Sequence, residues 1–130
     1  MNKCLLALLA FVFIGCANKG TKDVVSIDRD KIRQAIQERI KEYKKCYDLA
    51  LKKNPHASGK IEVKWLVKEG GKADKTQVFS SDFKDPEMEN CVVGIVATTK
   101  FPEPPKEQIA EVKFPFVFSP NATKKTVPKK

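Results

Sequence analysis

Apolar positions follow two different periods along the chain, and each period predicts a different kind of element. Over residues 26–55 they recur every three or four positions, which predicts one long helix with a single buried stripe. Ser26 or Asp28 can cap its start, and Asn54-Pro55 ends it. The stripe consists of Ile32, Ile36, Ile40, Tyr43 and Tyr47.

Alternation of apolar and polar residues predicts three strands. Residues 61–68 and 110–118 show this alternation, whereas residues 73–81 are more polar and are expected at a sheet edge. Gly70-Gly71 supplies the turn between the first two strands, because glycine readily adopts a positive φ.

A second helix is predicted over residues 85–100. Asp85 is expected to cap it, Pro86 suits the first helical position, and Glu87 and Glu89 favour the positive end of the helix dipole. Its inward line is expected to comprise Met88, Val92, Ile95 and Thr99.

The predicted order is helix, strand, strand, helix, strand, which defines an α+β domain. A hairpin followed by a crossover helix places the third strand beside the first. This gives a three-stranded sheet of order 2-1-3 with two helices on one face. Strands two and three are then both edges. Pro115 agrees with an edge position for strand three, because proline cannot donate to a β-ladder.

The apolar run Leu5–Ile14 has about half the length needed to span a bilayer, and it follows Lys3 and ends in small residues. This is the plan of a secretory signal. Residues 13–16, Phe-Ile-Gly-Cys, resemble the bacterial lipobox, although phenylalanine replaces the usual leucine or valine. The resemblance implies cleavage before Cys16 and a lipid on Cys16. An ordinary signal peptide cut elsewhere is the alternative.

These features divide the chain into four parts. Residues 1–15 are expected to be a lipoprotein signal peptide, and residues 16–28 a lipidated N-terminus and tether. Residues 29–118 are the expected folded domain, and residues 119–130 a basic disordered tail.

Charge adds a second candidate function. The chain carries 25 basic and 16 acidic side chains, and loss of Lys3 with the signal leaves 24 minus 16, or +8. Much of this excess lies in the tail. A basic surface of this kind can adhere to anionic glycan or lipid head groups, although charge alone does not select a partner.

Two cysteines remain once Cys4 leaves with the signal and Cys16 takes the lipid. The oxidising environment of an exported chain favours a disulfide between Cys46 and Cys91, with free buried thiols as the alternative. A zinc site is disfavoured, because zinc needs four ligands and His56 is the only histidine. We therefore expect no cofactor and no metal.

No combination of residues predicts catalysis, so we expect the protein not to be an enzyme and to have no small-molecule substrate. Ser80-Ser81 lacks an evident histidine partner and is more simply explained as a strand end. Asp85 and Glu87 are explained by helix capping. The exported address also argues against nucleic acid as a partner.

Seven short segments are informative because of the order in which they occur. They are CYDLALKKNP, GKIEV, GGKA, VFSSDF, ENCVV, FPEP and FPFVF. In this order they resemble the AgmX/PglI C-terminal domain family, a TonB-like family associated with gliding motility in predatory and social bacteria. The resemblance covers residues 29–118 and implies a TonB-C-terminal-like fold. The paired cysteines of the family fall on Cys46 and Cys91, in agreement with the expected disulfide.

TonB energy transducers resemble this domain but add an inner-membrane helix and a long proline-rich spacer. This chain is instead expected to carry a lipid anchor and a short tether. We therefore predict a binding or scaffold module that makes protein–protein contacts in the periplasm, in a motility or envelope-spanning complex. Ala17, which follows Cys16, indicates an outer-membrane address facing the periplasm.

Partner binding is expected at a free sheet edge, where a guest strand can be added. Pro115 should blunt the third strand in part if its missing donor faces outward. Docking is therefore assigned to the second strand, at Thr76, Gln77 and Val78, although TonB-like relatives use the last strand.

Overall fold

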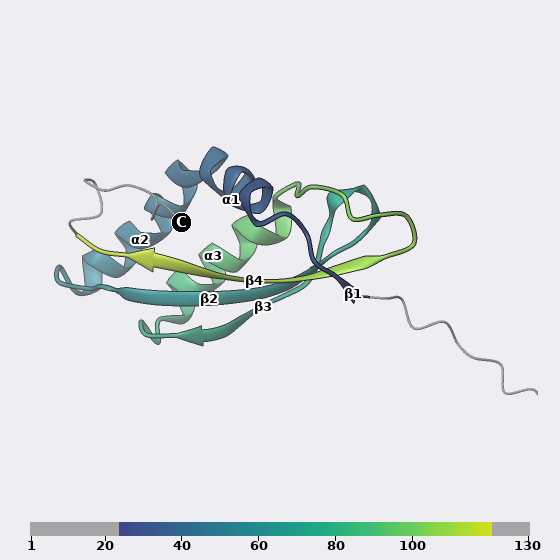
Figure 1. The fold of residues 1–130 in the computed structure, drawn as a ribbon. Helices are drawn as coiled ribbons and strands as arrows, with labels where there is room; N and C mark the ends of the chain where they lie inside the picture. The colour runs from purple at the N-terminus through teal and green to yellow at the C-terminus, as the bar shows by residue number, and fades with distance from the viewer. Residues whose placement is uncertain (1–23, 121–130) are drawn as a thin grey trace, which may run out of the picture.

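The computed structural model of the protein describes residues 24–120. Three α-helices and four strands follow one another along this part of the chain, and Figure 1 shows their arrangement. In chain order the elements are β1 (Val24–Val25), α1 (Arg29–Glu38), α2 (Ile40–Lys53), β2 (Gly59–Val67), the 3-10 helix η1 (Glu69–Gly71), β3 (Ala73–Ser81), α3 (Pro86–Thr98) and β4 (Ile109–Phe118). The fold is α+β, as the sequence predicts.

The four strands form one mixed sheet in the order β1-β4-β2-β3. β2 is antiparallel to both β3 and β4, while β1 lies parallel to β4. β2 and β4 pair without interruption, from Gly59 opposite Phe118 to Val67 opposite Ala110. The three long strands therefore lie in the predicted order.

The pairing of β3 with β2 is less regular. Its register shifts twice. Phe79 has no ladder partner at one shift, and Lys75 and Thr76 together face Trp65 at the other. Lys75 also has a φ of 50°. Such β-bulges bend and twist a strand, and they are common at sheet edges.

The helices pack against one face of the sheet, and the core lies between these two layers. In Figure 1, α1 and α2 run above the strands and α3 lies behind them. Every second side chain of β2 is fully buried, which leaves the other face of the strand open. Aromatic contacts join the parts of this core, with ring centres 4.9 Å apart for Tyr43 and Phe116 and 5.0 Å apart for Trp65 and Phe101.

The predicted long helix is in fact two helices, which corrects the single stripe expected from the sequence. The break is at Arg39, whose φ of −108° and ψ of 17° depart from helical values. α1 begins after Asp28, whose carboxylate caps the first turn, and it buries Ile32 and Ile36. After the break Ile40 is 47 % exposed rather than buried.

A second correction concerns residues 16–28, which the sequence predicts to be a tether. Val24 and Val25 pair with Ile109 and Ala110, so the sheet has four strands rather than three and the folded domain begins earlier than predicted. A two-residue strand is too short to show a period in the sequence. β4 is consequently flanked by β1 at its start and is an edge only beyond Ala110.

The second predicted helix and the hairpin turn are confirmed. Asp85 caps α3 by accepting backbone N–H groups of the first turn, and Pro86 occupies the first turn. Gly70 and Gly71 have φ values of 77° and 72°. The predicted inward line of the helix is buried throughout, at Met88, Val92, Ile95 and Thr99.

Several sequence-based predictions concern residues outside the described range. These are the signal peptide of residues 1–15, the lipid on Cys16, most of the tether of residues 16–28, and the basic tail of residues 119–130 beyond Pro120. They stay predictions.

Candidate functional site

The described sheet has two free edges where another strand could pair. One is the outer side of β3, which has no neighbouring strand within residues 24–120. The other is the outer side of β4 from Glu111 to Phe118, because β1 covers only Ile109 and Ala110. These two edges are the candidate site for the predicted protein partner.

A single hydrogen bond shows which backbone groups of β4 point outward. The Asp82 N–H donates to the Lys60 carbonyl at 2.9 Å, so the backbone of Lys60 faces β3. Backbone direction alternates along a strand, and Glu62 therefore also faces β3 rather than β4. Pro115 lies opposite Glu62. Its backbone consequently faces away from β2, toward the free edge.

The free edge of β4 is regular. Glu111, Lys113, Pro115 and Val117 all present their backbone groups outward, at the two-residue spacing that a guest strand needs. All four offer a carbonyl, and Lys113 and Val117 also offer an N–H. Proline has no N–H, and the parallel pairing of Val25 with Ala110 uses the N–H of Glu111. Pro115 therefore blunts the edge in part without interrupting the pairing of β4 with β2.

The residues predicted to dock a partner, Thr76, Gln77 and Val78, lie on β3 at the opposite edge. Val78 pairs with Val63, whose backbone faces β4, so the backbone of Val78 points outward. Gln77 pairs with Lys64 and points toward β2 instead. Thr76 lies in a bulge, and its buried hydroxyl has no hydrogen-bond partner among the described residues. Only Val78 thus has a regular outward position.

The open face of the sheet adjoins both edges and carries apolar and charged side chains. Phe79 is 57 % exposed and Val117 is 69 % exposed. The Lys113 ammonium lies 4.4 Å from the centre of the Phe79 ring, a cation–π contact that reaches across β2 from β4 to β3. Other charges of this face form ion pairs, at 3.0 Å for Lys60–Glu62 and Lys64–Glu111, and also between Lys68 and Asp74.

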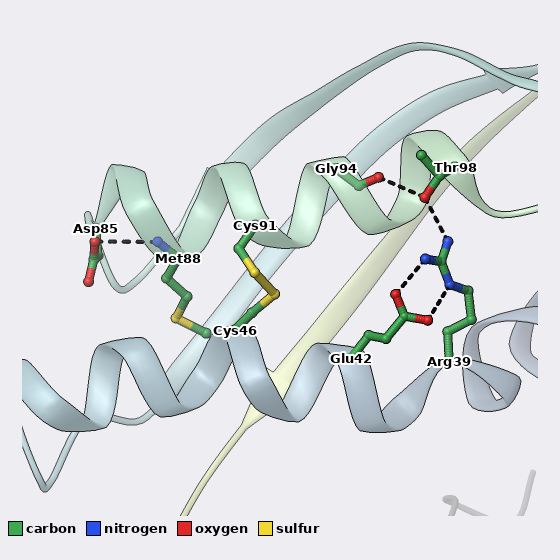
Figure 2. Close-up of a disulfide and its surroundings, with 8 residues drawn as sticks. All are labelled: Arg39, Glu42, Cys46, Asp85, Met88, Cys91, Gly94 and Thr98. Carbon is green, nitrogen blue, oxygen red and sulfur yellow. Dashed lines mark hydrogen bonds and ion pairs between the residues drawn. A yellow bond between two sulfur atoms is a disulfide. The ribbon is translucent and has the colours of Figure 1, made fainter.

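A disulfide joins the two long helices. Cys46 of α2 and Cys91 of α3 are bonded, with Cα atoms 5.6 Å apart, which lies within the ordinary range. Figure 2 shows the bridge between facing turns of the helices. Cys46 is fully buried, and neither cysteine belongs to a Cys-x-x-Cys motif, so the bond is structural. The predicted pairing is confirmed.

Arg39 makes a polar connection between the same helices that the sequence did not reveal. Its guanidinium donates to the Glu42 carboxylate at 2.7 Å, and in the last turn of α3 to the Thr98 hydroxyl at 2.7 Å and the Ile95 carbonyl at 2.9 Å. Figure 2 shows Arg39 between Glu42 and Thr98. The hydrogen bond between the two charged groups raises the pKa of Arg39 and lowers the pKa of Glu42. These contacts hold Arg39 where the helix breaks.

An open pocket of about 550 Å³ lies between the end of α2 and the start of α3. His56 lines it, and the His56 backbone N–H donates to the Asn54 side chain in a turn. Lys53 hydrogen-bonds to Glu87 and Asp85, at 2.7 Å and 2.9 Å, which raises the pKa of Lys53 and lowers the pKa of Asp85. Asp85 and Glu87 both contact Lys53, and Asp85 also caps α3. The two carboxylates are therefore not arranged as an acid–base pair.

Within residues 24–120, no three histidine, cysteine, aspartate or glutamate side chains gather as a metal site. No helix in that range is long and apolar enough to cross a membrane. Comparisons with known protein families, with curated proteins and with solved structures give no match. The resemblance to a TonB-like domain therefore rests on the sequence segments alone.

Proposed function

We propose that the protein is a lipid-anchored envelope module that binds another protein by accepting one of its strands at the outer edge of β4. The observation that supports this most is the regular outward spacing of Glu111, Lys113, Pro115 and Val117. A guest strand can hydrogen-bond to such a ladder while its side chains lie along both faces of the sheet. The exposed Val117 offers apolar contact beside that edge.

The edge of β3 is the competing docking edge, and Thr76, Gln77 and Val78 stay predicted there. Two bulges make it irregular, so a guest strand would have to follow both shifts of register. Pro115 removes a single donor from β4 and leaves the rest of that edge regular. TonB-like relatives, which the sequence resembles, use the last strand, and β4 is the last strand described here.

The proposed location follows from the expected lipid on Cys16 and from the alanine after it, which indicate an outer-membrane anchor facing the periplasm. The partner is then a protein of the cell envelope, in a motility or envelope-spanning complex. We propose a binding role rather than energy transduction, because a lipid anchor enters only one leaflet and contacts nothing across the membrane.

Proline substitutions at outward positions test the choice of edge. Val117→Pro removes an outward N–H from β4 without removing a bond to β2, and Val78→Pro does the same on β3. Val117→Ala and Val78→Ala are matched controls that keep the N–H. We expect Val117→Pro to weaken partner capture by about tenfold, the effect of losing one hydrogen bond. Val78→Pro should behave like its alanine control.

Capture is measured by crosslinking the tagged protein in intact cell envelopes and quantifying the bound protein by mass spectrometry. Thermal unfolding of each purified variant checks that the fold is intact. Loss of capture with Val78→Pro alone would assign docking to β3. Normal capture by both proline variants would exclude strand addition.

A further inference from the structure

The outer face of α2 carries a row of positive charges. Lys41, Lys44, Lys45 and Lys52 are exposed, and none has an ion pair within 4 Å with a described residue. At 100° per residue these four side chains fall within a sector of about 100°, on the side opposite the buried Ala50. We call this row the lysine ridge.

Little negative charge offsets the lysine ridge. Glu42 attracts Lys45, but its carboxylate is already hydrogen-bonded to Arg39. Asp48 is exposed within the same sector, so the ridge keeps four positive charges minus one, or +3. On the open face of the sheet, by contrast, Lys60, Lys64 and Lys113 lie against carboxylates or an aromatic ring. Four lysines without an ion pair to a described residue thus lie together along one face of α2.

The lysine ridge faces away from the sheet. The opposite side of α2 packs into the core through Tyr43, Cys46, Tyr47 and Ala50. Figure 1 shows α2 at the outside of the helical layer, with the strands beneath it. A flat surface that contacts the ridge would therefore leave the open sheet face and the edge of β4 accessible.

We infer that the lysine ridge binds the anionic lipid head groups of the membrane in which the protein is anchored. This inference rests on the lipid anchor of the proposed function. Only residues 17–23 separate the expected lipid on Cys16 from Val24, and even fully extended they span about 25–30 Å. The domain thus stays within reach of the head groups, where each lysine contributes about a fivefold gain in affinity.

The test uses the complete mature chain, residues 16–130, with Cys16→Ser so that no lipid is attached. Binding is measured by co-sedimentation with vesicles of phosphatidylglycerol in phosphatidylcholine, and with pure phosphatidylcholine vesicles for comparison. The ridge variant replaces all four ridge lysines with glutamine, which has a similar helix propensity. The control variant removes the same number of charges from the end of the chain, by Lys→Gln changes at Lys124, Lys125, Lys129 and Lys130.

We expect the unchanged chain to prefer the anionic vesicles and to lose this binding as salt rises. The ridge variant should bind roughly 600-fold more weakly, which is four losses of about fivefold each, and the control variant should lose less than about tenfold. Equal losses in both variants would show that net charge determines binding and would overturn the inference. Equal binding of the unchanged chain to anionic and neutral vesicles would also overturn the inference.

Two further measurements complete the test. Thermal unfolding shows that each variant is folded. Dextran sulfate serves as a soluble anionic glycan, and ridge-dependent binding to it without binding to vesicles would overturn the lipid assignment in favour of a glycan. Partner capture by the β4 edge is measured separately with the proline variants, so failure of the vesicle experiment and failure of the proposed function are distinguishable.

Discussion

At the residue scale, Gly71 shows how one missing side chain permits a long-range contact. Its φ is 72°, and its carbonyl accepts the Phe101 N–H at 2.9 Å. A Cβ at this position would overlap the carbonyl oxygen of Phe101. Phe101 is buried against Trp65. The hairpin turn therefore helps to position an aromatic side chain of the core.

Gly71→Ala should destabilise the domain by roughly 3 kcal/mol or more, because left-handed strain and steric overlap act together. Gly70→Ala is the matched control, since Gly70 has a φ of 77° but nothing within 4 Å of an added Cβ. It should cost about 1 kcal/mol. Urea unfolding measures both variants. Equal losses would mean that the close approach of Phe101 adds nothing to the backbone strain.

Two neighbouring residues of β3 illustrate what could not be predicted about the site. Gln77 and Val78 look equally suited to a strand edge in the sequence, yet their backbones face opposite ways. Their directions depend on the register with β2 and on the two bulges, and neither leaves a local signal. The disulfide could be predicted, because the expected signal peptide and lipid account for Cys4 and Cys16 and leave Cys46 and Cys91 as a pair.

At the scale of elements, the local pattern of apolar and polar residues predicted the long strands, and capping residues predicted α3. Alternation gives the buried face of β2 directly, and Asp85-Pro86 marks the start of α3. The helix break and β1 were missed because both depend on distant partners. Arg39 hydrogen-bonds to Ile95, 56 positions later in the chain. A periodic pattern within α1 and α2 contains no information about that contact.

The disulfide between α2 and α3 should contribute substantially to stability. It closes a loop of 45 residues, which corresponds to about 4 kcal/mol in the chain-entropy model. We expect the Cys46→Ala, Cys91→Ala double variant to lose about 3–4 kcal/mol of unfolding free energy. Guanidinium unfolding measures this loss. As a control, the unmutated chain with its disulfide reduced should lose a similar amount of unfolding free energy. A loss below about 1 kcal/mol would show that the other helix contacts suffice.

At the scale of the whole molecule, the two sides of the domain differ in chemistry. The sheet side has paired charges with exposed Phe79 and Val117, while the helix side carries the lysine ridge. The two proposals use these sides separately. A membrane surface against α2 and a partner strand against β4 can be bound at the same time.

The lipid anchor is the prediction on which the proposed location depends. We expect mass spectrometry of the mature chain to show cleavage between Gly15 and Cys16 and a lipid on Cys16. Cys16→Ala should leave the chain uncleaved and abolish the lipid, whereas the control Cys4→Ala should be processed normally. An unmodified N-terminus, or cleavage at another bond, would contradict the lipoprotein assignment.

The pairing of β1 with β4 has a mechanical consequence. β1 begins eight residues after Cys16, which carries the expected lipid. It pairs with Ile109 and Ala110 on the same edge of β4 that continues, from Glu111, into the proposed docking edge. Tension between the membrane and a captured strand would therefore pass through two adjacent β-strands, without loading the helices or their disulfide. β1, the shortest described strand of the sheet, would therefore be the first to detach from its neighbour under tension.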